Sequence, residues 1–242
     1  MSLYMIQLQL DPVAFVRFLQ SLGLNRKEDE DLGYGVHAWL ASIFGDLAPR
    51  PFRLFLASND RRPPKVLGYA QQPHSVLVDR AKSFAEPFTL SVCDLDKHID
   101  SRGMPTRWAG GTRLGFEVLA CPVGRKSRSG VEKDIYLIRS DSLGSDAELT
   151  REAVYGEWLA NLLGPACDVE NMELKGFRLV AQARRSSSKD KDQKRLTRLV
   201  RPQAQMSGVL KVHDGEAFGK IIARGIGRHR AFGYGMLLLR PA

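Results

Sequence analysis

The stretch Met206–Pro241, MSGVLKVHDGEAFGKIIARGIGRHRAFGYGMLLLRP, carries the strongest pattern in the chain. Its two ends, MSGVLKVH (206–213) and MLLLRP (236–241), are apolar runs typical of strands. Between them, DGEAFGKIIARG (214–225) starts with a capping residue and ends with a glycine, which predicts a short helix. From Gly225 onward, the segment combines four glycines with Arg228, His229 and Arg230. The pattern therefore predicts strand, helix and strand, with a flexible cationic segment before the last strand.

Upstream of this stretch, short strands again alternate with helices. The apolar patterns predict strands at 3–10, 52–57, 64–70, 88–92, 113–121, 133–139 and 174–183. They predict helices at 13–22, 33–44 and 148–164, and a helix or irregular segment at 73–86. Ser145 or Asp146 is the expected cap of the helix at 148–164, with Glu148 in its first turn. This mixture favours an α+β fold over a doubly wound sheet.

The length of the chain allows two small domains, each with its own core. The polar, glycine-flanked stretch GRKSRSG (124–130) suits a loop or linker. We therefore expect an N-terminal domain over residues 1–125 and a C-terminal domain over residues 126–242.

Positive charge is concentrated in the second half of the chain. Residues 1–120 hold 14 Lys and Arg against 13 Asp and Glu, a net charge of +1, whereas residues 121–242 hold 22 against 14, a net charge of +8. A basic half beside a neutral half indicates a polyanionic partner on one face. Nucleic acid fits this better than an anionic membrane, because no basic amphipathic helix is evident. The alternative is a generally basic surface.

Other features of the sequence bear on location. No stretch reaches the roughly 18–20 apolar residues of a membrane span, and the first residues lack the basic and apolar regions of a signal peptide. The three cysteines, Cys93, Cys121 and Cys167, are widely spaced and form no CxxC pair. These features predict a cytoplasmic protein without disulfides or a structural zinc site.

A basic hairpin is predicted between the strands at 174–183 and 206–213. Its polar tip, SSSKDKDQK, is unsuited to packing, and its cations can lie against a phosphate backbone. The alternative is a solvated surface loop. The candidate RNA-binding residues of this hairpin are Arg184, Arg185, Lys189, Lys191, Lys194, Arg195, Arg198 and Arg201.

The glycine-rich segment is a second candidate for RNA backbone binding. Glycines allow a ligand to approach the backbone closely, and the basic residues add cationic donors. The segment matches neither a Walker A loop nor a dinucleotide fingerprint, because it precedes a strand and no GK[ST] follows. A bulge or tight turn is the alternative. Its candidate RNA-binding residues are Gly225, Gly227, Arg228, His229, Arg230 and Gly233.

The stretch SGVLKVHDGEAFGKIIARGIGRHRAFGYGMLLLRP resembles the C-terminal signature of the CasE (Cse-type) family of CRISPR repeat endonucleases, within the RAMP superfamily. REAVYGEWLANLLG, LKGFRLVAQARR and RLGFEVLACPVGRK are also similar to segments of that family. The resemblance extends over most of the chain and is thinnest near residues 12–30 and 58–87.

This resemblance implies two tandem ferredoxin-like (RRM-like) domains with a C-terminal glycine-rich loop. It implies a role in RNA-guided antiviral defence, in which the enzyme cuts the repeat hairpins of a CRISPR precursor transcript without metal. It also implies that the protein stays bound to the mature guide RNA, beside other subunits of a surveillance complex. No cofactor is expected.

The resemblance places a catalytic tyrosine and histidine three residues apart on a helix of the N-terminal domain, and GYGVHAWLASIFGD has Tyr34 and His37 at that spacing. On a helix, Val36, Trp39, Leu40 and Ile43 would form the buried stripe, with Tyr34 and His37 on the flank away from it. Gly33 and Gly35 would let substrate approach closely.

The expected reaction is transesterification, in which the ribose 2′-OH attacks the adjacent phosphorus and leaves a 2′,3′-cyclic phosphate. His37 suits proton transfer near neutral pH, and Tyr34 suits a hydrogen-bond donor. Cations for the phosphorane could come from Arg26, Lys27, Arg228 or Arg230. No cluster has metal-ligand spacing, so no metal site is expected.

Two other functions remain open at this point. A non-catalytic subunit that binds the RNA hairpin would use the same basic face but would have no need of the Tyr34–His37 pair. A ribosomal or RNA-modification factor would explain the charge but not the whole C-terminal signature.

Overall fold

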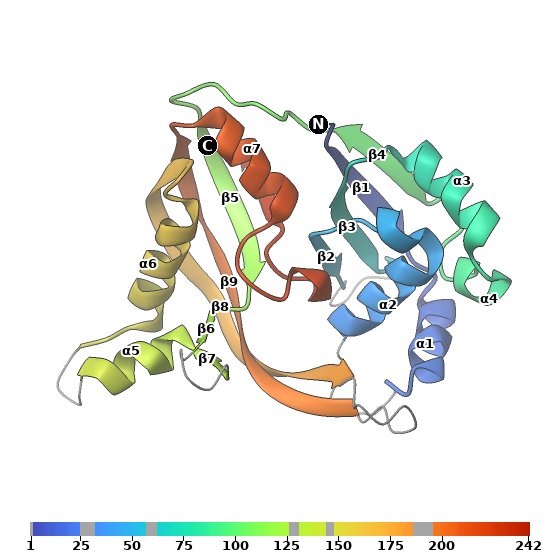
Figure 1. The fold of residues 1–242 in the computed structure, drawn as a ribbon, viewed down its shortest axis with the longest axis horizontal. Helices are drawn as coiled ribbons and strands as arrows, with labels where there is room; N and C mark the ends of the chain where they lie inside the picture. The colour runs from blue at the N-terminus through green and yellow to red at the C-terminus, as the bar shows by residue number, and fades with distance from the viewer. Residues whose placement is uncertain (1, 25–31, 57–61, 126–130, 144–147, 186–195) are drawn as a thin grey trace.

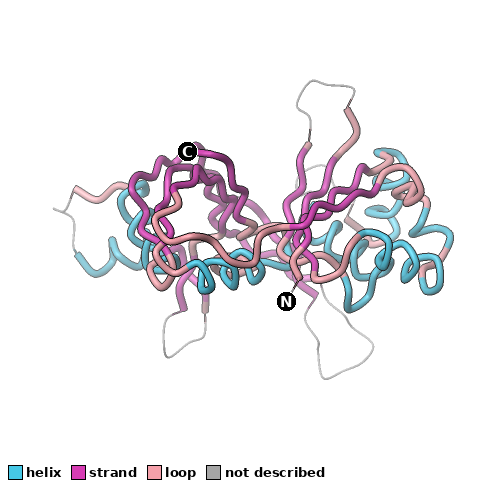
Figure 2. The backbone as a smooth tube through the Cα atoms, turned by 90° about the horizontal axis from the view of Figure 1, so that it is seen from above, coloured by secondary structure: helices cyan, strands magenta, loops and turns pink. Residues whose placement is uncertain are grey.

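The computed structural model describes residues 2–24, 32–56, 62–125, 131–143, 148–185 and 196–242. The chain forms two lobes that lie side by side, with one sheet in each, and the connection 104–112 crosses between them (Figures 1 and 2). Several predictions fall outside the described residues: the caps Ser145 and Asp146, the cations Arg26 and Lys27, and the tip of the basic hairpin.

The first lobe is a four-stranded antiparallel sheet in the order β2-β3-β1-β4. Its strands are β1 (Tyr4–Gln9), β2 (Phe52–Phe55), β3 (Lys65–Ala70) and β4 (Ile99–Gly103). Helices α1 (Pro12–Ser21), α2 (Leu32–Phe44), α3 (His74–Phe84) and α4 (Pro87–Leu90) lie to one side of the sheet (Figure 1), and the 3₁₀ turn η1 (Gly45–Leu47) follows α2. Asp11 caps α1 by accepting a 2.7 Å hydrogen bond from the Ala14 N–H, with Pro12 in the first turn.

The second lobe repeats this strand order, as β10-β5-β9-β8. Its strands are β5 (Arg113–Ala120), β8 (Cys167–Arg185), β9 (Leu196–Val212) and β10 (Leu237–Pro241), with α5 (Ile135–Leu143), α6 (Arg151–Leu163) and α7 (Gly215–Arg224) between them in the chain. A small sheet of β6 (Val123–Arg125) and β7 (Glu132–Asp134) and the 3₁₀ turn η2 (Arg230–Phe232) complete it. In each lobe the four strands of the sheet and their helices follow one another along the chain in the order βαββαβ. The predicted α+β fold with tandem ferredoxin-like units is thereby confirmed.

The long β8–β9 hairpin curves out of the second lobe toward the first (Figure 1). It confirms the hairpin predicted from the sequence. Beside it, the predicted helix at 214–225 is confirmed as α7, which Asp214 caps by accepting from the Glu216 and Ala217 N–H groups.

Four predictions of secondary structure were wrong or incomplete. The residues predicted as a strand at 88–92 fall in helix α4 (Pro87–Leu90) and the turn after it, because Pro87 opens a helical turn and the Thr89 hydroxyl donates to the Glu86 carbonyl. Residues 135–139 start helix α5, because the Asp134 carboxylate accepts from the Tyr136 N–H and so caps a helix there. Thr150, not a residue further upstream, caps α6. Strand β4 was not predicted.

The pairing of β5 differs from the expected division of the chain. A boundary after residue 125 leaves β5 in the N-terminal domain, whereas β5 pairs with β9 and β10 in the second sheet. The break between the two sheets lies in the connection 104–112.

Buried contacts join the two lobes. The Tyr69 hydroxyl on β3 donates a 2.8 Å hydrogen bond to the Leu237 carbonyl on β10, and both residues are buried. Arg53 on β2, which is 7% exposed, forms a 2.6 Å ion pair with Glu117 on β5. These contacts fix the lobes relative to each other, and residues from both lobes can therefore form a single site.

Candidate active site

Helix α2 presents Tyr34 and His37 on its half-buried flank. Val36, Trp39, Leu40 and Ile43 are buried in the core of the first lobe, as the helical spacing predicts. Gly35 is buried instead of open to substrate, because a side chain there would collide with Leu19 of α1. The helix thus holds Tyr34 and His37 in place through the core on its opposite face.

The aromatic ring of Phe232 in η2 packs against both candidate catalytic side chains. Its centroid lies 6.2 Å from that of Tyr34, with the rings stacked, and 5.4 Å from that of His37, with the rings edge to face. The centroid of the His229 ring also lies near Phe232, 6.1 Å from the centroid of the Phe232 ring. The glycine-rich segment of the second lobe therefore contacts helix α2 of the first through Phe232.

A cleft of about 730 Å³ opens beside this aromatic contact. Four arginines line it: Arg50 from the first lobe, and Arg224, Arg228 and Arg230 from the second. Arg50, Arg224 and Arg230 form no ion pair with a carboxylate among the described residues, whereas Arg228 pairs with Glu132. Burial and the charges of Arg224 and Arg50 lower the pKa of Arg230, which shows how closely these cations gather. Such a cleft is suited to a polyanion.

His37 does not line this cleft itself but lies next to residues that do: its ring contacts Phe232, and the charge of Arg50 acts on it. Burial, and after it the charge of Arg50, lowers the pKa of His37 below its ordinary value. The imidazole is therefore mostly neutral at pH 7 and has one ring nitrogen free of a proton, which is the form that accepts a proton.

Replacing Arg50 with alanine is expected to raise the pKa of His37 toward its ordinary value of about 6.5. The substitution removes a positive charge that disfavours the imidazolium, while the burial of the ring remains. An NMR pH titration of the His37 ring protons, assigned with a His37→Ala spectrum, measures this. Arg139→Ala, on α5 and paired with Glu157, is the control that should leave the titration unchanged. A pKa that stays put or falls in Arg50→Ala would contradict the assigned coupling.

The glycines of the segment 225–235 serve the fold of the segment itself. Gly225 is buried at φ +76°, and its N–H donates to the Ile221 carbonyl at the end of α7. A Cβ there would lie 2.8 Å from Pro51 of the first lobe. Gly227 lies against the Trp158 ring, and Gly233 is buried near Phe52. This placement favours structural roles for these glycines, and their contact with RNA stays a prediction.

Three of the predicted RNA-binding cations converge on one carboxylate. Glu132 on β7 accepts from Arg228 at 2.8 Å and from His229 at 2.8 Å, and forms a 3.2 Å ion pair with Arg201 on β9. Burial alone would raise the pKa of Glu132, but the hydrogen bond and charge of His229, with Arg228 and Arg201, hold it below the usual range. Arg201 and Glu132 are both 13% exposed. The sequence offers no signal for this cluster, since its members come from distant segments.

The predicted RNA-binding residues of the hairpin are only partly described. Arg184 and Arg185 lie at the end of β8 and Arg198 lies in β9, where Arg198 pairs with Ala183 in the ladder. Lys189, Lys191, Lys194 and Arg195 lie outside the described residues. Among the hairpin candidates whose side chains the structure describes, Arg201 reaches Glu132, which lines the cleft.

Sequence reasoning missed Arg50, Arg224 and Phe232 as members of the site. Arg224 is the last residue of α7, next to the predicted loop, and Phe232 lies inside the quoted signature, so both carried a local signal. Arg50 carried none, because its place at the cleft depends on how the lobes pack.

Neither a metal-binding cluster nor a membrane-spanning helix occurs in the described part of the chain. Within it, no group of three or more His, Cys, Asp or Glu side chains comes together in a way that could hold a metal ion. Nor does any helix in those residues combine the length and apolar character needed to cross a membrane.

Comparison with solved structures shows the fold. The chain is similar to the CRISPR endoribonuclease Cse3 bound to a 19-nucleotide RNA, with a TM-score of 0.67, 18% identity, and coverage of 98% of this chain and 100% of that one. It is similar to Thermus thermophilus Cse3 bound to an RNA representing a pre-cleavage complex, with a TM-score of 0.58, 17% identity and full coverage of both chains. It is also similar to the CRISPR-associated protein Cas6e from Escherichia coli K-12, with a TM-score of 0.54, 19% identity and full coverage of both chains.

Sequence comparison shows the family. No curated protein sequence matches the chain significantly. The model of the family described as "CRISPR associated protein" matches residues 3–241, which is nearly the whole chain. The expected resemblance to a CRISPR-associated family is thereby confirmed, and the protein belongs to the CRISPR-associated protein family.

Proposed function

We propose that the protein is a metal-independent endoribonuclease that cleaves CRISPR precursor RNA within its repeat hairpins. The observation that carries this proposal is the position of His37, beside Tyr34 and next to residues of an arginine-lined cleft. A proton-transfer group next to unpaired cations is what cleavage of an RNA phosphodiester requires.

The reaction needs no co-reactant. The ribose 2′-oxygen bonds to the adjacent phosphorus, and the bond from phosphorus to the 5′-oxygen breaks. The 2′-OH proton passes to a base, and a proton is delivered to the departing 5′-oxygen. The products are a 2′,3′-cyclic phosphate and a free 5′-OH.

His37 and Tyr34 are assigned the proton-transfer and orienting roles. The lowered pKa of His37 favours the neutral ring, which can accept the 2′-OH proton. The ring of Tyr34 stacks on Phe232, and its hydroxyl orients the nucleotide or the leaving oxygen by hydrogen bonding. Arg50 and Arg230 stabilise the extra negative charge of the phosphorane, because no carboxylate among the described residues pairs with either of them.

Binding of the guide RNA is assigned to the basic hairpin and the cationic segment 225–235. The family and the fold support this, since two of the similar structures are endoribonucleases bound to RNA. A further similar chain, with a TM-score of 0.60 and 16% identity, belongs to a CRISPR RNA-guided surveillance complex. We place this protein in the cytoplasm as a subunit of such a complex that keeps its product RNA.

The proposal is tested with labelled repeat RNA from the same genome, incubated with the protein in EDTA. We expect one cut that leaves a cyclic phosphate, which acid opens, on one fragment and a 5′-OH, which a kinase labels directly, on the other. RNA with a single 2′-deoxy nucleotide at the cut is the matched control, because it lacks the nucleophile. Tight binding without a cut would favour the alternative, a non-catalytic subunit that holds the RNA hairpin.

A further inference from the structure

We infer that Glu132 is a positioning residue for the cleavage reaction: it clamps the glycine-rich segment so that Phe232 orders His37, and it withholds Arg201 and Arg228 from RNA. This inference rests on the proposed function. It gives one carboxylate two opposite effects, support of cleavage and restraint of RNA binding.

Glu132 has the contacts of a clamp. Its Oε1 accepts from Arg228 Nη1, and its Oε2 accepts from His229 Nε2, both at 2.8 Å. Arg201 reaches the same Oε2 at 3.2 Å and the Glu132 backbone carbonyl at 3.3 Å. The carboxylate is 13% exposed, so these contacts are poorly screened by solvent. They hold the middle of the segment 225–235 against the second lobe.

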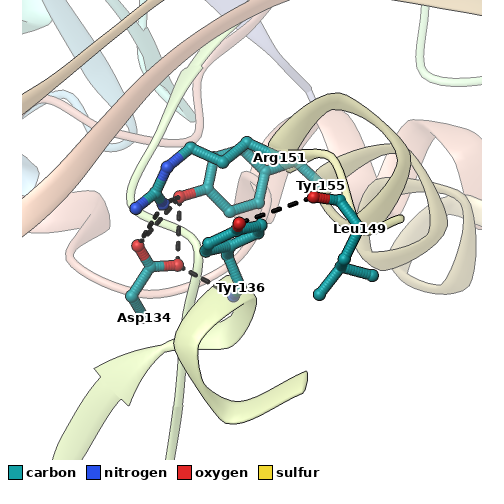
Figure 3. Close-up of polar contacts among 5 residues, drawn as sticks. All are labelled: Asp134, Tyr136, Leu149, Arg151 and Tyr155. Carbon is teal, nitrogen blue, oxygen red and sulfur yellow. Dashed lines mark hydrogen bonds and ion pairs between the residues drawn. The ribbon is translucent and has the colours of Figure 1, made fainter. Parts of the chain in front are cut away.

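The clamp is itself fixed by the strand that carries it. Two residues along β7, the buried Asp134 carboxylate binds Arg151 Nη1 at 2.6 Å and accepts from the Tyr155 hydroxyl at 3.0 Å. Figure 3 shows Arg151, Tyr155 and Tyr136 gathered around this carboxylate. The Arg151 guanidinium also lies 4.3 Å from the centre of the Tyr136 ring. Strand β7 is thus anchored to α5 and α6, which gives Glu132 a rigid base.

A chain of ring contacts connects the clamp to the catalytic helix. His229 is held by Glu132 and lies 6.1 Å from Phe232, which lies 5.4 Å from His37. His229 adopts the left-handed conformation, with φ 59°, that turns the chain into η2. A non-glycine residue in this conformation is disfavoured in isolation, so the hydrogen bond that His229 donates to Glu132 helps to keep the turn that places Phe232.

The same contacts take cations away from the RNA. Arg228 is 42% exposed and lines the cleft, yet its charge is compensated by Glu132. An RNA phosphate must compete with this carboxylate to bind Arg228. Removing the negative charge would free Arg228 and Arg201 for phosphates while loosening the segment that orders His37.

The test is Glu132→Gln, with Glu157→Gln as the matched control because Glu157 is exposed on α6 and forms an ion pair with Arg139. At saturating RNA we expect the single-turnover cleavage rate of Glu132→Gln to fall about 10- to 100-fold. RNA affinity should stay equal or rise, and its logarithm should fall more steeply with the logarithm of salt concentration, by about 0.7–0.9 for each arginine that gains a phosphate and so by about 1.4–1.8 when both do. Glu157→Gln should match wild type in both.

Opposite changes in cleavage and affinity distinguish positioning from misfolding, which lowers both. Cleavage equal to wild type, or a parallel loss of cleavage and affinity, would overturn the inference.

An NMR readout separates the inference about Glu132 from the proposed function: the His37 ring resonances should shift in Glu132→Gln as the Phe232 ring current moves away. If wild type does not cut RNA but this shift occurs, the clamp stands and the proposed ribonuclease function fails. If wild type cuts RNA and neither rate nor shift changes, the clamp alone fails.

Discussion

Replacing His37 with alanine is expected to lower the rate of repeat-RNA cleavage by about 10²- to 10⁴-fold, which is the range for loss of a general acid or base. The substitution removes the only side chain assigned to proton transfer and leaves Arg50 and Arg230 in place. Alanine is a good helix former, and His37 lies on the half-buried flank of α2, so the helix should persist. The measurement is the single-turnover rate at saturating RNA in EDTA.

RNA affinity of the His37 variant should remain within a few-fold of wild type, because most binding energy comes from phosphate contacts elsewhere. His98→Ala is the matched control, since His98 is an exposed residue just before β4. Cleavage by His37→Ala at the wild-type rate would leave the family and fold in place but would show that the assigned active site is wrong.

Replacing Arg50 or Arg230 with alanine is expected to lower cleavage at saturating RNA by about 10²-fold each, the cost of removing one group that stabilises charge in the transition state. Both guanidiniums face a cleft beside His37, and neither pairs with a carboxylate among the described residues. Their charges are therefore available to the phosphorane, which is more negative than the substrate. Because the effect falls on the transition state, it should survive at RNA concentrations that saturate binding.

Arg139→Ala removes the same charge from α5, where Arg139 pairs with Glu157, and should cleave at the wild-type rate. The Arg230 variant also loses a 2.9 Å hydrogen bond to the Arg224 carbonyl, so its melting temperature is measured alongside. Variants that bind weakly but cut normally once saturated would show that the cleft holds a part of the RNA away from the scissile phosphate.

Local patterns predicted most of the elements of the fold. The spacing of Val36, Trp39, Leu40 and Ile43 identified the buried face of α2, and Asp214 with Gly225 marked both ends of α7. These features depend on neighbours in sequence, which is the reason they could be read from it.

Elements whose alternation of apolar residues was ambiguous were predicted less well. FTLSV alternates like a strand, yet Pro87 and the Thr89 hydroxyl start a helical turn, and the Trp39 indole donates to the Thr89 carbonyl 50 residues away in sequence. IYLIR is rich in β-branched and aromatic residues, but the Asp134 cap turns it into a helix. In both cases a local side-chain hydrogen bond accompanies a helical turn where strand propensity pointed the other way.

The candidate site was predictable only in part. The Tyr34–His37 pair lies within one helix and was identified through the family resemblance, whereas Arg50 and Glu132 join the candidate site through packing between distant segments. The sequence likewise assigned Arg201 and Arg228 to RNA without showing the carboxylate that binds them. Long-range pairing of this kind leaves no periodic signal.

The pairing of the two lobes also sets when the proposed activity can arise during synthesis. His37 is translated before Arg224, Arg230 and Phe232, which all follow it by more than 180 residues. A nascent chain that ends before residue 224 carries the histidine but has only one wall of the cleft and no Phe232 ring against it. Its own messenger RNA, threaded through the same ribosome, is therefore not exposed to the complete cleft, and so to the proposed activity, until β10 has joined β5.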